Sequence, residues 1–585
     1  MSALIASQRS KFATVISLAI LMLMAFAAPA RANGDPVNPV PAADRQVSWT
    51  TPEYDPQAVA ASNRVNYLLA FTGGLETKAQ GSNIRAYNAD GSQSRLCDTT
   101  LSCLDAEFSR FTAQGQMDLC SRAKSAPCLE SLEYKLSQGD YKKALYAFTV
   151  DPSPTASDVQ RAKANGALNV QLKSGWADGE VQGLPASASG PLVFDLPGAI
   201  NSAGTSTYAI DSAFSLSGQK GLTGGSLSGF HASVIPVKDD PTSHCESIWY
   251  DTKIGSNSLT NGLGCADDQK AYFSSQSIGW ASRFPENLTL RLTMRLPQSL
   301  GGWLQGRADS PNVNITSQPD GSNLVAIEAA PTTVPTTATP VAMYDPAKSN
   351  IAKLFGLTNP YWDQFRPQDG TAPGSIYTSG DAWTPARGGS SLIGEVAAEV
   401  GNKAKGSISV WEFKQLTSSG PCVSDASALQ GLLTTNAMTY QPDLPAMSEG
   451  YLTYSVAGLH YDSSGSVFQG SYNFVMRDSV ARCLYGFKNN APISGTISVS
   501  SSEGQEYVAN TSVTDDGTWL RLTAQGFTFS NPVIRVKLAE TVSAEPKIAP
   551  TPPSTSKSAV RCVRGKITKT IRGTSPKCPT GFTKK

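Results

Sequence analysis

Ten cysteines are the residues of this sequence whose type and spacing point most directly to chemistry. Five, seven, nineteen, sixty and fifteen residues separate the members of successive pairs, whereas zinc sites typically use Cys-x-Cys spacings of about two to four residues. An even number of cysteines in an exported chain is typical of disulfide bonds. Proximity predicts the pairs 245–265, 422–483 and 562–578, while the first four cysteines can pair as neighbours or nested. The candidates are Cys97, Cys103, Cys120, Cys128, Cys245, Cys265, Cys422, Cys483, Cys562 and Cys578.

Other reactive residues form no recognisable catalytic pattern. The three histidines, His231, His244 and His460, are interpreted as structural or surface residues. The sequence contains no zinc-protease, nucleophile-elbow, phosphate-loop or calcium-loop motif, so neither a metal nor another cofactor is predicted. The glycine-rich segment 221–229 lacks a following helical pattern and is predicted to be a loop.

Paired carboxylates leave one enzymatic alternative open. Glycoside hydrolysis needs two carboxyl groups about 5–9 Å apart, a separation that sequence does not reveal. The adjacent pairs Asp239-Asp240, Asp267-Asp268 and Asp515-Asp516 all lie in turn-like contexts, where aspartate is favoured for backbone reasons.

Aromatic residues near strand or loop edges suggest a second kind of site. Exposed aromatic rings can stack on sugar rings, but tryptophan is mostly buried on average. Core packing is therefore the preferred interpretation, and sugar binding the alternative. The candidates are Trp280, Trp303, Tyr485 and Trp519.

The first 32 residues have the pattern of a secretory signal peptide. Arg9 and Lys11 precede an apolar run over 12–28, and Ala30-Arg31-Ala32 forms a small-residue cleavage site. No later stretch reaches about 18 apolar residues, so no transmembrane span is expected after cleavage. The predicted location is secreted, either extracellular or associated with the cell envelope.

Charge is distributed unevenly along the chain. The net charge of +1 excludes an overall nucleic-acid footprint. Residues 33–556 hold 36 basic against 47 acidic groups, whereas residues 557–585 hold nine basic and no acidic groups. Such a tail is expected to bind an anionic cell-wall polymer or envelope surface, the alternative being a solubilising tail without a partner. The candidate binding residues are Lys566, Lys569, Arg572, Lys577, Lys584 and Lys585.

Hydrophobic periodicity predicts a mainly β chain. Residues 288–296 alternate strictly between apolar and polar, as in a half-buried strand, and Asp320-Gly321 and Asp516-Gly517 are hairpin-type turns. Helices are expected only at 56–71, 347–357 and 392–403. The predicted fold is two related antiparallel β-sandwich-like domains with short helical insertions, plus a small disulfide-stapled tail.

Composition places the boundaries of these parts. Proline-rich stretches are predicted linkers because they bury too little apolar surface to offset chain entropy. The predicted parts are a signal peptide (1–32), a cysteine-containing region (33–185), β domain copy A (186–328), a Pro/Thr linker (329–346), β domain copy B (347–538), a Pro-rich linker (539–557) and a basic two-cysteine tail (558–585).

Three collinear blocks suggest that the two β domains arose by duplication. Residues 233–245, 292–306 and 315–326 resemble residues 409–422, 474–486 and 497–509, at offsets of 176 to 183. In this comparison Cys422 matches Cys245, but Cys483 matches Trp303. Trp303 is therefore expected to fill, in copy A, the space of the bridge partner in copy B.

The tail also carries a resemblance. Its pattern from Cys562-Val-Arg-Gly-Lys through Pro576-Lys577-Cys578-Pro579 to the terminal lysines resembles a C-terminal tail of uncharacterised secreted actinobacterial proteins. The block 476–487, together with Gly526-Phe-Thr-Phe529, is similar to exported proteins of the same group. This resemblance implies an envelope or extracellular setting and no known activity.

Two functional hypotheses follow. The preferred one is an exported, non-enzymatic binding or structural protein of the cell envelope or extracellular space, with an unknown ligand. The alternative is a secreted carbohydrate-active hydrolase whose carboxylate pair is unidentified.

Overall fold

Two compact units make up the chain. The structure, a computed structural model, describes most of residues 82–336, 397–540 and 558–585, with short gaps, and strands at 66–70, 340–342 and 375–377. The other stretches of ten or more residues, including the predicted signal peptide, lie outside the described residues: 1–65, 71–81, 343–374, 378–396 and 541–557. Unit 1 comprises residues 1–488 and 494–538, and unit 2 comprises residues 489–493 and 539–585.

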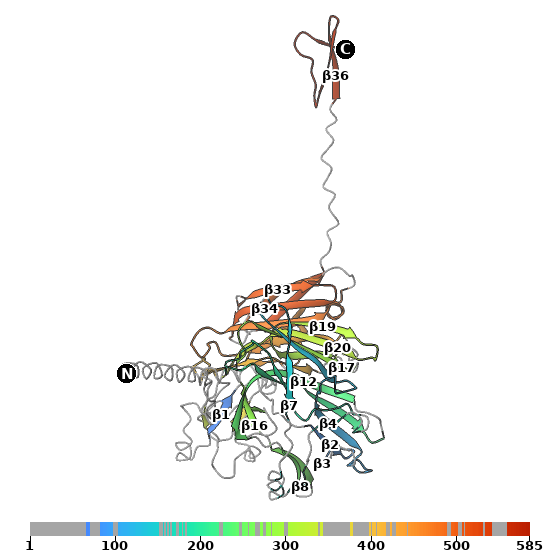
Figure 1. The fold of residues 1–585 in the computed structure, drawn as a ribbon. Helices are drawn as coiled ribbons and strands as arrows, with labels where there is room; N and C mark the ends of the chain where they lie inside the picture. The colour runs from blue at the N-terminus through green and yellow to red at the C-terminus, as the bar shows by residue number, and fades with distance from the viewer. Residues whose placement is uncertain are drawn as a thin grey trace, which may run out of the picture. The chain divides into compact units, whose positions relative to one another are not determined.

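A long sheet forms the centre of unit 1 (Figure 1). Neighbouring strands along its main path are antiparallel, except that β18 and β26 run parallel. In path order the strands are β3 (Ser94–Leu96), β2 (Asn83–Tyr87), β4 (Arg110–Gln116), β11 (Ala213–Gln219), β12 (Ser226–His244), β25 (Glu412–Leu416), β18 (Gly302–Arg307), β26 (Leu429–Thr435), β30 (Gln469–Arg477), β34 (Trp519–Thr528) and β33 (Asn510–Asp515).

Shorter strands branch from this path at β12. Both β10 and β16 pair with β12; β9 pairs with β10, β7 with β9, and β15 with β16. Their bounds are β7 (Leu145–Thr149), β9 (Leu192–Asp195), β10 (Thr207–Asp211), β15 (Lys270–Tyr272) and β16 (Ser277–Ala281).

A second sheet packs on one face of the central sheet. The strict alternation over Leu288–Leu296 predicts a half-buried strand, and that strand, β17, alternates between buried and half-buried residues along its whole length. Its leucines share one hydrophobic core with Trp411 and Phe413 of the central layer. The sheet order is β19 (Asp309–Ser317), β20 (Asn323–Ala330), β17 (Leu288–Leu296), β5 (Cys128–Leu136) and β6 (Lys142–Lys143).

A third sheet covers the other face of the central sheet near β18, β26 and β30. Gln305 Nε2 in β18 donates to Tyr454 Oη in β29 over 2.8 Å, and the rings of Tyr454 and Tyr472 lie 5.6 Å apart. The central sheet is therefore a middle layer here. The covering strands are β27 (Thr439–Tyr440), β28 (Ala446–Ser448), β29 (Tyr451–Ala457), β35 (Val533–Glu540), β31 (Ile493–Ser500) and β32 (Glu506–Tyr507).

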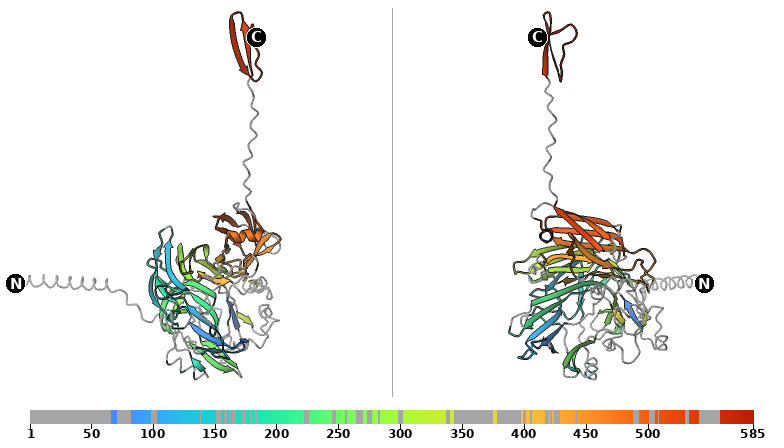
Figure 2. Two further views of the ribbon diagram at one scale, coloured as in Figure 1. Left: turned by 90° about the vertical axis from the view of Figure 1, so that its right-hand side faces the viewer. Right: turned by 180° about the vertical axis from the view of Figure 1, so that it is seen from behind.

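The layers bring together segments that are far apart in sequence. Figure 2 shows late strands, in orange, beside β19 and β20, in yellow-green. Arg521 Nη2 donates to Asn312 Oδ1 over 3.0 Å, across 209 residues of sequence.

Three smaller sheets contain β22 (Pro340–Ala342), β1 (Asn66–Ala70) and β23 (Ser375–Tyr377); β14 (Asn257–Leu263), β13 (Ile248–Ile254) and β8 (Ala167–Val170); and β21 (Thr332–Thr336) with β24 (Gly406–Val410).

The mainly β fold class is confirmed, but the central sheet crosses the predicted domain boundary. Strand β18, from predicted copy A, lies between β25 and β26, from predicted copy B. The predicted linker also differs from expectation over 329–336, because β21 pairs with β24 and Val334 is fully buried. The hydrogen-bonding partner of this Pro/Thr stretch lies some seventy residues away, so local composition could not reveal it.

The aligned blocks of the proposed duplication differ in secondary structure at one place. Residues 302–306 lie in strand β18, whereas residues 482–485 lie in helix α6 (Asp478–Tyr485). Trp303 and its aligned counterpart Cys483 therefore lie in different kinds of element. Trp303 lies in a strand paired with β25 and β26, whereas Cys483 lies in helix α6. The duplication itself stays a prediction.

Helices were predicted less well than strands. Residues 66–70 of the expected helix 56–71 form β1, paired with β22 and β23. The expected helix 347–357 and most of 392–403 lie outside the described residues. Helix α6 was not expected because it is only eight residues long. An Asp478–Arg482 ion pair at 2.6 Å stabilises it, and Gly486, at φ 67°, ends it.

Unit 2 contains a small three-stranded sheet. Its order is β37 (Ile567–Gly573), β36 (Ser558–Arg564) and β38 (Thr583–Lys584), and both pairings are antiparallel. A two-residue turn, with Gly565 at φ 57°, joins β36 to β37. Val560 and Cys562 are buried.

Candidate functional site

Four disulfides lie within the described residues. The pairs 422–483 and 562–578 are confirmed, and the first four cysteines pair as neighbours, 97–103 and 120–128, so the nested alternative is wrong. The 422–483 bridge joins a loop to helix α6, and the 562–578 bridge staples the tail. The predicted 245–265 pair lies outside the described residues.

The predicted aromatic candidates do not gather into one site. Trp303 is fully buried, stacks on Phe474 at 5.5 Å and donates from Nε1 to Val423 O over 3.4 Å. Trp519 is 7% exposed and belongs to the hydrophobic core. Tyr485 is half-buried, and its hydroxyl donates to Val536 O over 2.6 Å. Trp280 lies in β16, opposite Lys238 of β12. Trp303 and Trp519 have the core role preferred from sequence, whereas Tyr485 is only half-buried.

The six predicted tail cations are all exposed, together with Arg561 and Arg564. Strand register divides them between two faces, because directly opposite residues of an antiparallel pair point the same way. Lys569 and Lys584 both lie opposite Cys562, on the face that carries the bridge.

The other face of the tail sheet is more open. Arg561 is next to Cys562 in β36, so its side chain points to the other face, as does that of Thr570 opposite it. Arg572 lies opposite Ala559, two residues before Arg561, and therefore points to the same face as Arg561. Lys585 donates its backbone N–H to Arg561 O over 2.9 Å, which fixes the C-terminal lysine beside that arginine. Sequence composition found the charges, but only register separates them into an open face and a bridge face.

A pocket of about 360 Å³ lies beside the 120–128 bridge in unit 1. Its lining comes from five separate segments, so no local sequence signal marks it. Sequence analysis missed it for that reason. The lining residues are Leu119, Cys120, Ser121, Leu129, Glu130, Ser131, Leu132, Lys143, Ala144, Tyr146, Phe194 and Arg295.

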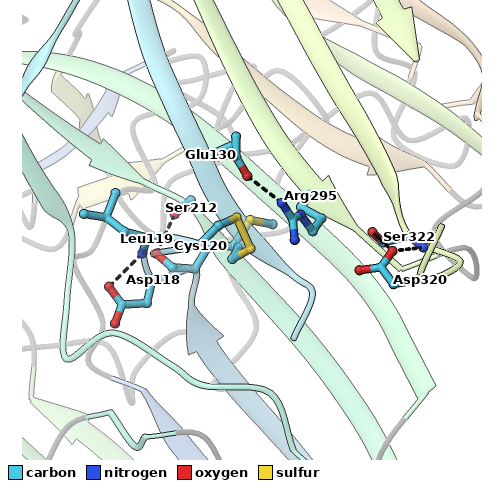
Figure 3. The surroundings of a disulfide bond; sticks show 10 residues. Asp118, Leu119, Cys120, Glu130, Ser212, Arg295, Asp320 and Ser322 are labelled. Carbon is cyan, nitrogen blue, oxygen red and sulfur yellow. Dashed lines mark hydrogen bonds and ion pairs between the residues drawn. A yellow bond between two sulfur atoms is a disulfide. The ribbon is translucent and has the colours of Figure 1, made fainter. Parts of the chain in front are cut away.

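Charged side chains surround this bridge. Figure 3 shows Arg295, from β17, beside Glu130, from β5, with the bridge next to them; Arg295 Nη2 lies 3.0 Å from Glu130 Oε2. Among the described lining residues, Glu130 is the one carboxylate, and it is paired with this arginine. Two carboxyl groups are needed for glycoside hydrolysis, and the described lining does not supply them.

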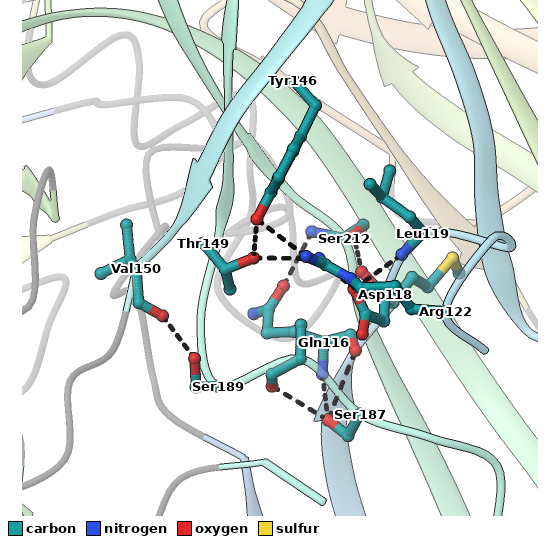
Figure 4. Close-up of polar contacts among 12 residues, drawn as sticks. Gln116, Asp118, Leu119, Arg122, Tyr146, Thr149, Val150, Ser187, Ser189 and Ser212 are labelled. Carbon is teal, nitrogen blue, oxygen red and sulfur yellow. Dashed lines mark hydrogen bonds and ion pairs between the residues drawn. The ribbon is translucent and has the colours of Figure 1, made fainter. Parts of the chain in front are cut away.

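The pocket wall at Tyr146 is held by a polar network (Figure 4). Arg122 Nη1 donates to Tyr146 Oη over 2.8 Å, and the guanidinium lies 4.8 Å from the centre of the tyrosine ring. The Tyr146 hydroxyl is also 2.8 Å from Thr149 Oγ1, and Arg122 pairs with Asp118. The ring packs edge-on against Phe194 at 5.8 Å. These contacts fix an aromatic side chain that is 38% exposed.

A buried polar ladder crosses the central sheet away from the pocket. Asp211, Ser233, Glu412 and Arg307 lie opposite one another in successive strands β10, β12, β25 and β18. All four are buried, and the Ser233 hydroxyl has no hydrogen-bond partner among the described residues. The core residues Ala232, Trp411 and Phe413 alternate with this ladder and face the second sheet.

Electrostatic contacts balance the ladder. Glu412 lies 3.7 Å from Arg307 Nε and 3.8 Å from His231 Nε2. Burial opposes protonation of His231, but the carboxylates of Glu412 and Asp211 outweigh that effect and raise its pKa. Burial also disfavours the charged form of Asp211. It therefore raises the pKa of this carboxyl group, although His231 and the hydrogen bond from Gln116 act in the opposite direction. The ladder is interpreted as structural, because its members lie outside the pocket lining.

No family model matches this chain, and a search of curated proteins finds no match. Within the part of the chain that the structure describes, no helix has the length and apolar character needed to cross a membrane. In that same part, no three His, Cys, Asp or Glu side chains group as a metal site. Four disulfides are typical of an oxidising extracellular environment.

Proposed function

We propose that this chain is an exported, non-enzymatic binding or structural protein of the cell envelope or extracellular space, held to an anionic surface by its tail. The observation that carries this proposal is the tail, in which every predicted cation is exposed and no acidic residue occurs between 558 and 585. A bridged sheet holds these charges at fixed spacing, so they act together on a repeating polyanion.

The open face is the expected contact surface. Arg561, Arg572 and Lys585 project from the side opposite the bridge, interleaved with threonines. Arginine and threonine side chains can both donate hydrogen bonds to phosphate or carboxylate oxygens. The resemblance of the tail to C-terminal tails of secreted actinobacterial proteins supports an envelope setting.

Retention of the full mature chain on isolated cell walls tests the proposal. Near a charged surface each Lys or Arg contributes about fivefold in affinity at low salt. Replacing Arg561, Arg572 and Lys585 with glutamine is therefore expected to weaken retention by about a hundredfold. The matched control replaces Lys569, Lys577 and Lys584, which removes the same charge and is expected to have a smaller effect.

Salt and deletion complete the test. Retention is expected to fall steeply with ionic strength and to disappear when residues 558–585 are deleted. Equal retention of the deleted and full chains at low salt would show that the tail is not the attachment site.

A further inference from the structure

The pocket beside the 120–128 bridge combines an apolar floor with a charged rim. Leu129, Leu132, Ala144 and Phe194 form the floor, and each is at most 4% exposed. Small-molecule sites have this composition, a mostly apolar cavity with a few polar groups, and its volume of about 360 Å³ is near the lower end of their usual range.

The rim is cationic overall. Lys143 and Arg295 line the pocket on the positive side, and Glu130 is the one acidic residue in the lining that the structure describes. Lys143 lies opposite Glu133 of β5, which is outside the lining and is itself 3.5 Å from Arg291; among the described lining residues, the one carboxylate is already paired with Arg295. The Arg295 side chain is 32% exposed, so its guanidinium can be reached from solvent beside the pair with Glu130.

The walls are rigid before any ligand arrives. Cys120 lines the pocket, and its bond to Cys128 closes the loop that forms one wall. Tyr146, which forms another wall, is held by Arg122 and Thr149. Fixed walls lower the ordering cost of binding a small ligand.

We propose that this pocket binds a small amphipathic carboxylate, a molecule with one anionic head and a compact apolar body. The head lies at Lys143 and Arg295, and the body covers the floor formed by Leu129, Leu132, Ala144 and Phe194. This site is separate from the basic tail, and its ligand is recognised by shape and apolar contact as well as by charge.

Isothermal titration of the full mature chain with three probes tests the proposal. Hexanoate has both head and body, hexan-1-ol keeps the body without the charge, and acetate keeps the charge without the body. Hexanoate is expected to bind more tightly than either other probe. Equal affinity for hexanoate and hexan-1-ol, or no detectable hexanoate binding at its highest soluble concentration, would overturn the proposal.

Neighbouring residues provide matched controls for the head group. Lys143→Gln is expected to weaken hexanoate binding about three- to fivefold, the range for a partly solvated ion pair, and to leave hexan-1-ol unchanged. Lys142→Gln removes the same charge from an exposed lysine outside the lining and is expected to change neither. Equal effects of the two lysine variants on hexanoate would overturn the assignment of the head group.

A second pair of variants tests the wall. Tyr146→Ala is expected to weaken hexanoate and hexan-1-ol alike, because both use the same apolar contact. Leu145→Ala, at a neighbouring residue that is 56% exposed and outside the lining, is expected to leave both unchanged. Unchanged binding in a correctly folded Tyr146→Ala variant would show that the ligand lies elsewhere.

Repeating the titrations on the chain that lacks residues 558–585 separates this site from the tail, because hexanoate binding is expected to persist in the deleted chain.

Discussion

Replacing Glu412 with glutamine removes the negative charge at the centre of the buried ladder. The Arg307 side chain is fully buried and that of Glu412 is 8% exposed, so water cannot solvate the arginine charge when Glu412 is neutralised. At 3.7 Å and an effective dielectric constant of about 20, their attraction is about 4 kcal/mol. Breaking one side of a buried ion pair generally costs about 3–5 kcal/mol, because the other charge stays buried.

Other contacts of Arg307 set the expected value at the lower end of that range. Its guanidinium donates to Ala437 O and, over 3.0 Å, to Met438 O, and it lies 4.9 Å from the centre of the Tyr440 ring. These groups keep part of the charge compensated when Glu412 is neutralised. Glu412→Gln is therefore expected to lower the free energy of unfolding by about 3 kcal/mol.

Glu328→Gln is the matched control, since it makes the same chemical change at another arginine pair. Glu328 lies 2.9 Å from Arg291 and 3.3 Å from Lys135, and the three side chains are between 26% and 32% exposed. Pairs of this exposure contribute about 1 kcal/mol or less because water screens them. Urea unfolding of the oxidised chain, followed by tryptophan fluorescence, gives both values. Equal losses for the two variants, within about 0.5 kcal/mol, would refute the reasoning that burial sets the cost.

Three further outcomes are expected. Removing the 422–483 bridge, whose cysteines are 61 positions apart, should cost about 2 kcal/mol more in unfolding free energy than removing the 97–103 bridge, whose cysteines are 6 positions apart. Equal urea midpoint shifts would contradict the loop-entropy argument. His231→Gln should cost more below pH ~6.5 than above the folded pKa, because the raised pKa of His231 adds stability that is lost as pH rises; a flat pH profile of the difference would exclude this. Gly431→Ala should destabilise the chain by about 1–3 kcal/mol, measured by thermal unfolding, since a Cβ there would lie 2.3 Å from Val475 O and 2.4 Å from the Trp303 ring.

Local patterns in the sequence correctly predicted the strand at 288–296 and two of the described bridges. Strict alternation over 288–296 predicts one buried face, because successive residues of a strand point to opposite sides, and β17 has that burial pattern. Proximity along the chain correctly predicted the 422–483 and 562–578 bridges, whereas it left the first four cysteines open between neighbouring and nested pairing. These properties depend on residues close together in the chain.

Long-range pairing was not predictable from such patterns. The predicted boundaries placed β18 in one domain and β25 and β26 in another, but β18 lies between those two strands, so the sheet crosses the expected boundary at 329–346. Residues 66–70, expected in a helix, form a strand because β22 and β23 provide hydrogen-bonding partners. Residues 482–485 form a helix although their aligned counterpart is a strand.

The sequence by itself determined the positions of the cysteines, the alternating strand at 288–296 and the concentration of positive charge at the C-terminus. Only the tertiary structure brought Glu130, Lys143, Tyr146 and Arg295 around one pocket and separated the tail cations into two faces. The physical reason is that composition and alternation are properties of a few neighbouring residues, whereas a pocket depends on which distant strands lie side by side.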